Sequence, residues 1–324
     1  MIPRVLAIAG SDSGGGAGIQ ADIKTITMLG GHAMTAITAI TAQNTLGVTQ
    51  VMPVPTEMVL AQIDAVASDI GIDAVKIGMI GSAETVEAVA RALTPSPLGG
   101  EERGGRSCSQ HDLRDAGGIP HRLAEEGASD SEPPPSTPSP PTRLRERPPP
   151  LPQGERGFTV VFDPVMIATS GATLADAATI AAFARLMQVA TLVTPNAPEL
   201  AALTGLPVET EAQLETAAQT LAARHQIAVL AKGGHLPGDM LTDLLVQPDG
   251  TITRWSDARI ETRHNHGTGC TLSSAIATGL AAGLTLEDAI AQARAFVRAA
   301  LEAAPGLGQG HGPMGQGLGR AHFP

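Results

Sequence analysis

Apolar and polar positions alternate along the chain in a way that predicts strands and helices in turn. Short apolar runs typical of buried strands lie at 4–10, 33–42, 74–81, 159–166, 191–196 and 227–234. Helical patterns occupy 19–30, 56–70, 82–93, 173–187, 197–204, 210–224, 268–282 and 285–303. Residues 240–255 predict a hairpin that turns around Pro248, Asp249 and Gly250. This alternation predicts an α/β fold of three layers with a mostly parallel central sheet.

One segment, residues 95–157, interrupts the alternation. It holds 13 of the 25 prolines and almost no periodic apolar residues, so it cannot bury enough surface to offset its ordering entropy. An interdomain linker is one interpretation, but the same pattern runs up to Leu93 and resumes at Thr159, which favours an insertion. We therefore predict a single domain made of 1–94 and 158–313, a disordered insertion at 95–157 and a Gly-rich tail at 314–324.

Composition narrows the class of protein. The chain has 324 residues, of which 43% are hydrophobic, so a sizeable core is possible. A net charge of −11, no tyrosine and one tryptophan argue against a nucleic-acid partner. No apolar stretch reaches the roughly 18 residues of a membrane span, and the first apolar run is too short for a signal peptide. With only Cys108 and Cys270 available for disulfides, we expect a protein of the reducing cytoplasm.

Glycine and polar residues gather where the predicted strands end. The segments are GSDSGGGAG, QNTLG, MIGS, DPVM, PNAPE and KGG. Ligands of parallel sheets bind at the carboxyl ends of the strands, so this coincidence indicates an enzyme. The first segment, residues 10–18, is similar to a phosphate cradle but fits neither GxxxxGK[ST] nor GxGxxG, and a flexible turn is the alternative.

Several charged or amide side chains at these strand ends have two interpretations each. Asn196 and Glu199 share one face of a first helical turn, either as a capping box or facing Mg²⁺. Lys232, one of three lysines beside 18 arginines, is either a phosphate ligand or a surface residue. Asp163 either faces a metal-bound water or phosphate, or ends its strand in a turn. Asp22 belongs either to a solvated helix face or to a ligand site.

The stretch HNHGTGC, residues 264–270, leads into a predicted helix. Glycine-rich turns of this kind present bare backbone N–H groups, which suit a phosphate or a developing anion. Cys270 is the first side chain in the turn that is able to do acid–base work. His264 and His266 lack partners at zinc-ligand spacing, so a metal site there is not expected.

Taken together, these motifs resemble a known family. GSDSGGGAGIQADIKT, TAITAQNTLGV, KIGMIGS, DPVM, TPNAPE, VLAKGGH and HGTGCTLSSAIA are similar to the bacterial hydroxymethylpyrimidine/phosphomethylpyrimidine kinases of the ribokinase-like superfamily. The resemblance covers residues 3–94 and 158 to about 313, and the insertion departs from it. It implies a ribokinase-like α/β/α fold and a homodimer. It also implies a kinase of thiamin biosynthesis that uses ATP and Mg²⁺ to phosphorylate the pyrimidine alcohol and then its monophosphate.

The resemblance also implies a role for individual positions. Cys270 would be catalytic. The pyrimidine pocket would be lined by Gln43, Gly10, Asp22, Met79 and Val165. The nucleotide phosphates would be bound by Lys232, Asn196, Gly267, Thr268 and Gly269. Asp163 and Glu199 would bind the metal ion. For Gln43 the chemistry agrees, because an amide offers a donor and an acceptor to a ring nitrogen beside an exocyclic amine.

Cys270 stands where many sugar kinases of the superfamily place an aspartate base. A helix N-terminus lowers the pKa of a thiol, so we expect Cys270 to act as the base for the hydroxymethyl group. In the second step a neutral thiol would not repel the incoming phosphate monoester, as an aspartate would. Three alternatives remain: a small apolar filler at this position, a pyridoxal kinase, and a catalytically silent ligand sensor on the same fold.

Overall fold

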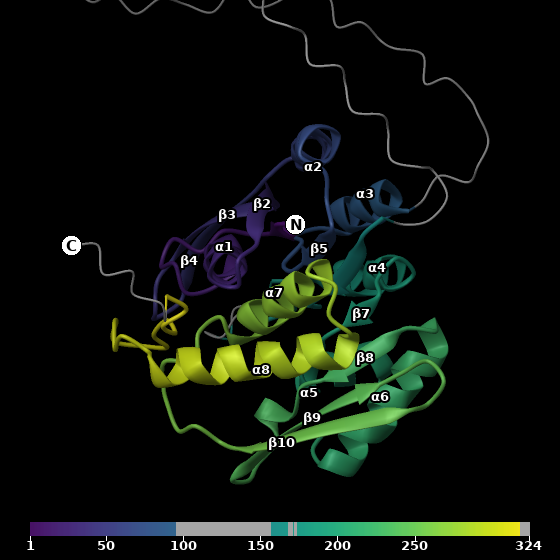
Figure 1. Cartoon of the computed structure of the whole chain (residues 1–324), viewed down its shortest axis with the longest axis vertical. Coiled ribbons are helices and arrows are strands. Elements are labelled where there is room, and N and C mark those ends of the chain that lie inside the picture. Colours follow the sequence, from purple (N-terminus) through teal and green to yellow (C-terminus); the bar gives the residue numbers. More distant parts are fainter. Residues whose placement is uncertain (95–156, 168–170, 172–173, 318–324) are drawn as a thin grey trace, which may run out of the picture. The chain divides into compact units, whose positions relative to one another are not determined.

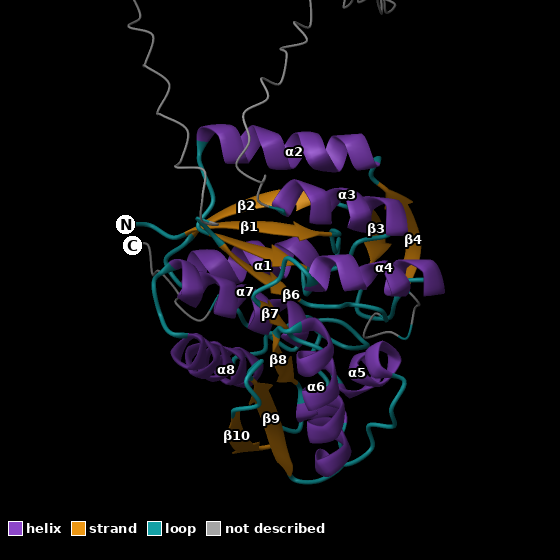
Figure 2. Ribbon diagram, turned by 90° about the vertical axis from the view of Figure 1, so that its right-hand side faces the viewer, coloured by secondary structure: helices purple, strands orange, loops and turns teal. Residues whose placement is uncertain are grey.

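The computed structural model of the protein describes residues 1–94, 157–167, 171 and 174–317. Within them, an eight-stranded sheet forms the centre (Figure 2). Its strands in spatial order are β10 (Ile252–Ala258), β9 (Met240–Val246), β8 (Ala228–Ala231), β7 (Leu192–Val193), β6 (Thr159–Phe162), β5 (Ala74–Ile77), β1 (Arg4–Ala9) and β2 (His32–Ile37). The run from β8 to β2 is parallel, and β9 and β10 form the predicted antiparallel hairpin at one edge.

Helices cover both faces of this sheet. One face carries α1 (Gly18–Met28), α7 (Thr268–Ala281) and α8 (Leu286–Glu302). The other carries α2 (Thr56–Asp69), α3 (Ala83–Leu93), α4 (Ala177–Met187), α5 (Ala197–Thr204) and α6 (Glu211–His225). Helices α7 and α8 lie side by side, as Figure 1 shows. The predicted three-layer α/β/α architecture with a mostly parallel sheet is confirmed.

The sheet separates two hydrophobic cores. Along β1, Leu6 and Ile8 pack toward α2, α3 and α4, whereas Val5 packs toward α1, α7 and α8. On β6, Phe162 meets Phe183 of α4 edge to face, with ring centroids 5.1 Å apart. Strands that are buried on both faces need apolar residues at every position, which is why their sequence runs are continuous rather than alternating.

The apolar run at 33–42 does not form the single buried strand that its composition predicts. Strand β2 ends at Ile37, and the chain then leaves the sheet as β3 (Ala39–Gln43), which pairs with β4 (Val48–Pro53) in a separate antiparallel ribbon. Along β3 the burial alternates, with Ala39 buried and Ile40 48% exposed. At the junction the Thr38 hydroxyl donates to the Met79 carbonyl at 2.6 Å. The switch carries Gln43 away from the sheet and to the cavity described below.

Two predicted boundaries also differ from the structure. Helix α4 begins at Ala177 rather than at 173, because the Asp176 carboxylate accepts the Thr179 N–H at 2.8 Å and caps the helix. In the described part of the Gly-rich tail, residues 314–317, two side chains are buried, since Met314 and Gln316 are 3% and 1% exposed. The Gln316 side chain donates to the Gly16 carbonyl at 3.4 Å.

The predicted insertion, residues 95–157, lies almost entirely outside the described residues, as do 318–324. The insertion and the single-domain assignment therefore stay predictions. Among the helices that the structure describes, none is both long and apolar enough to cross a membrane.

Candidate functional site

The carboxyl ends of β1, β5, β6 and β8 open into one cavity of about 880 Å³. The predicted site residues that line it are Gly10, Gln43, Met79, Asp163, Val165, Asn196, Glu199, Lys232, Gly267, Thr268, Gly269 and Cys270. They come from segments spread over most of the chain, and the fold brings them together in one cavity. Of the predicted site residues, all of which are described, Asp22 alone does not line the cavity.

Asp22 belongs instead to a buried ion pair. Its carboxylate oxygens lie 2.9 and 3.0 Å from Lys76 Nζ, and both side chains are fully buried. The Ser274 hydroxyl of α7 donates to the same carboxylate at 2.7 Å. Burial opposes the charge on Lys76, but the negative groups around it, first Asp22 and then others such as Asp163, together outweigh burial and raise the lysine pKa. Asp22 thus supports the helix that carries Cys270. No role for Lys76 follows from the sequence motifs, although a lysine inside the apolar strand AVKI is a signal for a buried partner.

The N-terminus of α7 forms one wall of the cavity. Gly267 precedes the helix in the left-handed region, with φ +87°, and a Cβ there would collide with the Gly16 carbonyl oxygen. Only glycine fits this position. Gly267, the N-cap residue, has no side chain to cap the first turn, and the Thr268 N–H donates to the Asn265 carbonyl at the long distance of 3.4 Å. With Thr268 and Gly269 lining the cavity, this turn is suited to bind an anion.

An acidic and basic cluster adjoins that turn. Lys232 Nζ lies 2.8 Å from Asp163 Oδ1 and 4.0 Å from Glu199 Oε2. The Thr194 hydroxyl also donates to Asp163, at 3.1 Å. A Cβ on Gly269 would lie 3.3 Å from Asp163 Oδ2 and 3.4 Å from Lys232 Nζ, so the helix start and the cluster are in close contact. Lys232 is only 14% exposed, which excludes the surface-lysine interpretation.

Asn196 and Glu199 form the capping box that was one of their two interpretations. Asn196 Oδ1 accepts the Glu199 N–H at 2.9 Å, and Glu199 Oε2 accepts the Asn196 N–H at 2.8 Å. Both residues also line the cavity, so capping does not remove them from the site. Burial raises the pKa of Glu199 to about 7, although Lys232 opposes the shift. This carboxyl group therefore changes charge near neutral pH.

The thiol of Cys270 behaves differently from the sequence-based expectation. Burial raises its pKa to about 11, and the nearby Lys76 only partly offsets this, while Asp22 and Asp163 raise the pKa further. The expected lowering by the helix N-terminus is therefore wrong for the free protein. The physical reason is that removal of the thiolate from water, next to two carboxylates, outweighs the helix end. Cys270 is a neutral thiol at pH 7, and it keeps partial contact with the cavity.

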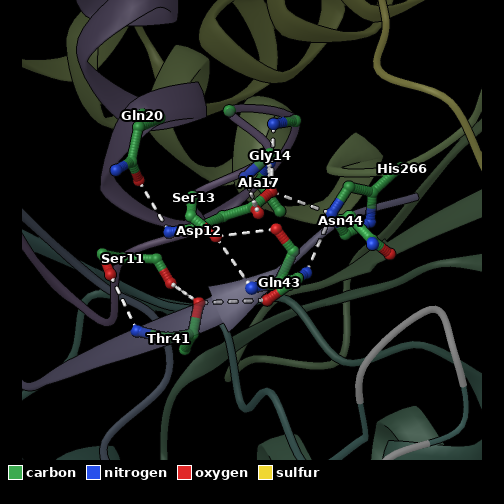
Figure 3. A network of polar contacts seen from close by, with 12 residues as sticks. Ser11, Asp12, Ser13, Gly14, Ala17, Gln20, Thr41, Gln43, Asn44 and His266 are labelled. Atoms are coloured by element: carbon green, nitrogen blue, oxygen red, sulfur yellow. Dashed lines mark hydrogen bonds and ion pairs between the residues drawn. The ribbon is translucent and has the colours of Figure 1, made fainter. Parts of the chain in front are cut away.

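The glycine-rich loop 10–18 is organised around its own aspartate. The Asp12 carboxylate accepts the N–H groups of Gly14 at 2.9 Å, Gly16 at 2.9 Å and Ala17 at 2.7 Å (Figure 3). Because the Asp12 carboxylate already occupies these donors, the contacts favour the turn interpretation of this loop over the phosphate cradle. The loop is a hydrogen-bonded turn that leads into α1.

Gln43 also lines the cavity and is in contact with this loop. Its backbone N–H donates to Ser13 Oγ at 2.7 Å, and its side-chain nitrogen lies 3.1 Å from His266 Nε2. His266 in turn lies 3.0 Å from Asp12 Oδ2. The sequence motifs predict no role in the site for Asp12 or His266, because each is recognisable only through its contacts.

Gly10 and Met79 complete this side of the cavity. A Cβ on Gly10 would lie 2.6 Å from Met79 Cε, so the methionine methyl fills the space that a side chain at position 10 would need. Met79 thus adds apolar surface to the cavity that the Gln43 amide also lines, a combination that suits a flat heteroaromatic ring with polar edge atoms.

Comparisons with known proteins agree with this geometry. The family described as phosphomethylpyrimidine kinase matches residues 12–98 and 153–315. The hydroxymethylpyrimidine/phosphomethylpyrimidine kinase of Rhizobium meliloti is 42% identical over 97% of each chain. Two solved structures share the fold. The ADP complex of Bacillus subtilis pyridoxal kinase has 27% identity and a TM-score of 0.73, and covers 98% of both chains. Phosphomethylpyrimidine kinase from Clostridium difficile 630 has 30% identity and a TM-score of 0.63, with 92% of this chain and 98% of the other covered. This chain therefore belongs to the phosphomethylpyrimidine kinase family.

Proposed function

We propose that this protein transfers a phosphoryl group from ATP to 4-amino-5-hydroxymethyl-2-methylpyrimidine and then to the monophosphate, giving the diphosphate for thiamin biosynthesis. The observation that carries the proposal is that one cavity combines the Gln43 amide with the N-terminus of α7, Cys270 and Lys232. The first suits the edge of an aminopyrimidine, and the others suit a phosphoryl group in transfer. The relative from Rhizobium meliloti bears the name of this activity and covers nearly the whole chain.

The residues of the chain divide the work between binding and charge stabilisation. Phosphoryl transfer needs mainly positioning and neutralisation of negative charge. The N–H groups at Thr268 and Gly269 would hold the transferred group, and Lys232 would contribute a positive charge next to them. Gln43 would orient the ring so that its hydroxymethyl group points to Cys270. Met79, Val165 and Gly10 would exclude water around the ring.

The donor atoms at Asp163 and Glu199 fit a magnesium ion that arrives with the nucleotide. Among the described residues, no group of three or more His, Cys, Asp or Glu side chains could hold a metal ion. Mg²⁺ is usually bound through one or two carboxylates together with substrate phosphates and water, and Asp163 and Glu199 are two carboxylates that line this cavity. When bound, the ion would neutralise charge on the transferring phosphate. The nucleotide assignment is supported by the ADP that was solved with the Bacillus subtilis pyridoxal kinase.

The neutral state of the Cys270 thiol is mainly an advantage for the second phosphorylation. Its acceptor is a phosphate monoester, which an ionised side chain at this position would repel and a neutral thiol accommodates. In the first phosphorylation the acceptor is an alcohol, and only the small thiolate fraction of Cys270 can act as its base. This gives the two steps different dependences on pH.

Pyridoxal kinase is the second candidate, because the Bacillus subtilis pyridoxal kinase shares the fold at a TM-score of 0.73. Purified protein with ATP and Mg²⁺ would be supplied with the hydroxymethylpyrimidine or with pyridoxal, and the products identified by mass spectrometry. We expect both a monophosphate and a diphosphate of the pyrimidine. Pyridoxal phosphate as the main product would replace the proposal by the second candidate, and no turnover of either compound would favour a silent ligand sensor.

The resemblance also supports a homodimer located in the cytoplasm. Light scattering on a size-exclusion column would test the first point. A mass of one chain at micromolar concentration would contradict it.

A further inference from the structure

Asp12, Gln43 and His266 lie together at the cavity, and their contacts restrict which of their atoms can carry the hydrogen-bonding protons. His266 Nε2 lies 3.0 Å from Asp12 Oδ2 and 3.1 Å from the side-chain nitrogen of Gln43. Figure 3 shows the three residues together with Thr41. His266 is 7% exposed and Asp12 is 1% exposed, so water does not replace these contacts. The protons must therefore be shared among the protein groups themselves.

The position of one proton follows from Asp12. Burial opposes its charge, but the hydrogen bond with His266 and those from the loop N–H groups outweigh burial and lower its pKa. An ionised carboxylate only accepts hydrogen bonds. Its contact at 3.0 Å thus requires a proton on His266 Nε2, whether the imidazole is neutral or charged.

That proton conflicts with the amide nitrogen of Gln43. An amide NH₂ group only donates, so it forms no hydrogen bond with a protonated Nε2 at 3.1 Å. The other end of the amide has the same problem. The Thr41 hydroxyl gives its one proton to the Ser11 carbonyl at 2.9 Å, so it has none for Gln43 Oε1 at 3.4 Å.

A half-turn of the amide about its last bond removes both conflicts. It exchanges Oε1 and Nε2, which have nearly the same shape, and moves no other group. The oxygen then shares the one His266 Nε2 proton with Asp12 Oδ2 in a three-centre hydrogen bond, and the NH₂ group donates to Thr41 Oγ1.

We infer that His266, with its Nε2 proton fixed by Asp12, is a positioning residue that holds the Gln43 amide with its oxygen on the His266 side and its NH₂ group on the Thr41 side. Gln43 lines the cavity, so its remaining lone pair and N–H meet the substrate in that fixed order. This inference rests on the proposed function for the identity of the substrate. Asp12, His266 and Gln43 together then determine which substrates fit, because the exocyclic amine must lie toward His266 and the ring nitrogen toward Thr41.

The fixed orientation of the Gln43 amide disfavours binding of one particular analogue. In the 4-oxo analogue, an oxygen replaces the amine and the neighbouring ring nitrogen carries a proton, so donor and acceptor are exchanged. A fixed amide meets this edge with two mismatched contacts. Sites built to hydrogen-bond a substrate reject such mismatches strongly, because buried polar groups are left unpaired.

The test compares kcat/KM for the 4-amino and the 4-oxo compound in four proteins: the wild type, His266→Leu, His266→Gln and the control His264→Leu. We expect the wild type to prefer the amino compound by about 10²-fold or more. In His266→Leu the amide is free to turn, and the preference should fall at least about tenfold, with KM for ATP unchanged. His266→Gln should keep most of the preference, because Asp12 orients its amide N–H toward Gln43. His264→Leu changes the neighbouring histidine, which does not line the cavity among the residues described there, and should match the wild type.

An unchanged preference in a folded His266→Leu variant, with folding judged by circular dichroism melting, would overturn the inference. A second readout needs neither substrate nor that variant. In ¹⁵N-labelled wild-type protein, the Gln43 NH₂ signals, identified by their loss in Gln43→Ala, should show nuclear Overhauser contacts to the Thr41 methyl group and none to the His266 ring. Contacts to the His266 ring instead would refute the amide orientation. A wild type that phosphorylates neither pyrimidine but shows the Thr41 contacts would refute the proposed function and leave the amide orientation standing.

Discussion

Lys76 Nζ lies 2.9 Å from Asp22 Oδ1, and both side chains are fully buried beneath the helix that carries Cys270. Ser274, one turn after Cys270 on α7, donates to the same carboxylate at 2.7 Å. The ion pair therefore joins β5, α1 and α7 at one point. It also supplies the positive charge that counteracts the rise of the Cys270 pKa. The Lys76–Asp22 pair therefore holds three elements together and also affects the pKa of the Cys270 thiol.

Replacing Lys76 by methionine should destabilise the protein strongly. The Asp22 carboxylate would be left buried without its partner, which typically costs about 3–5 kcal/mol of unfolding free energy. Urea unfolding followed by circular dichroism measures this. Lys24→Met is the matched control, since Lys24 is exposed and donates to the Gly15 carbonyl. The double variant Lys76→Met/Asp22→Leu should recover part of the loss, and a loss below about 1 kcal/mol in the single variant would contradict the account.

Glu199 should make stability depend on pH. Its pKa rises from the ordinary value of 4.5 to about 7 in the folded protein, so its contribution is fully present below pH 4.5 and is lost as the pH rises through 7. Glu199→Gln keeps the cap, because an amide oxygen also accepts the Asn196 N–H, but it does not titrate. Without nucleotide or metal, the wild type should lose roughly 2–3 kcal/mol relative to this variant between pH 5 and pH 8. Parallel pH profiles of the two proteins would exclude the assignment.

Cys270 should separate the two phosphorylation steps. With a thiol pKa of about 11, the rate on the alcohol should increase with pH from 7 to 9 if the thiolate is the base. The rate on the monophosphate should stay nearly constant, since that acceptor is already ionised. Cys270→Ala should abolish the increase and slow the first step by about 10²-fold, with a smaller effect on the second.

The variant Cys270→Asp gives the complementary result. Its carboxylate should support the first step and impair the second through repulsion of the phosphate monoester. Steady-state rates on the purified alcohol and monophosphate measure each step separately. Equal losses in both steps for Cys270→Ala would leave the thiol a structural role only.

Deleting residues 97–155 and joining the ends with a short Gly/Ser linker should leave folding and turnover largely intact. The family matches residues on both sides and leaves 99–152 unmatched. Loop-closure entropy changes slowly with length, so we expect a change in unfolding free energy of about 1 kcal/mol or less. Thermal unfolding and pyrimidine turnover of the deleted protein check this. Loss of the cooperative transition would show that the segment is part of the fold.

The sequence by itself determined the layers and the place of the site. Continuous apolar strands alternating with helical segments leave few arrangements besides a parallel sheet covered on both faces, and the carboxyl ends of such strands meet at one edge. Hence Lys232, Asp163 and the turn before Cys270 could be placed in one cavity from their positions at strand ends and at a helix start. These are local signals, and local signals are readable in a single sequence.

What the sequence could not decide depended on contacts between distant segments. The run at 33–42 fits a buried strand as well as it fits β2 followed by β3, and only the pairing with β4 selects the second. Asn196 and Glu199 cap a helix and also line the cavity, so both interpretations of this pair hold at once. Only the folded structure shows this, because it brings Lys232 to 4.0 Å from Glu199 Oε2. A short pattern cannot encode such a choice, since the deciding atoms belong to other elements.

The pKa of Cys270 and the hydrogen bonds of loop 10–18 show most clearly what the sequence alone cannot decide. The helix end before Cys270 predicts a lowered pKa, but burial and the carboxylates of Asp22 and Asp163 raise it to about 11. The loop at 10–18 carries the glycines of an anion site, but its donors bind the carboxylate of Asp12. A pKa or a hydrogen bond is set by what surrounds a group in space, and burial and long-range charges exist only once the chain has folded.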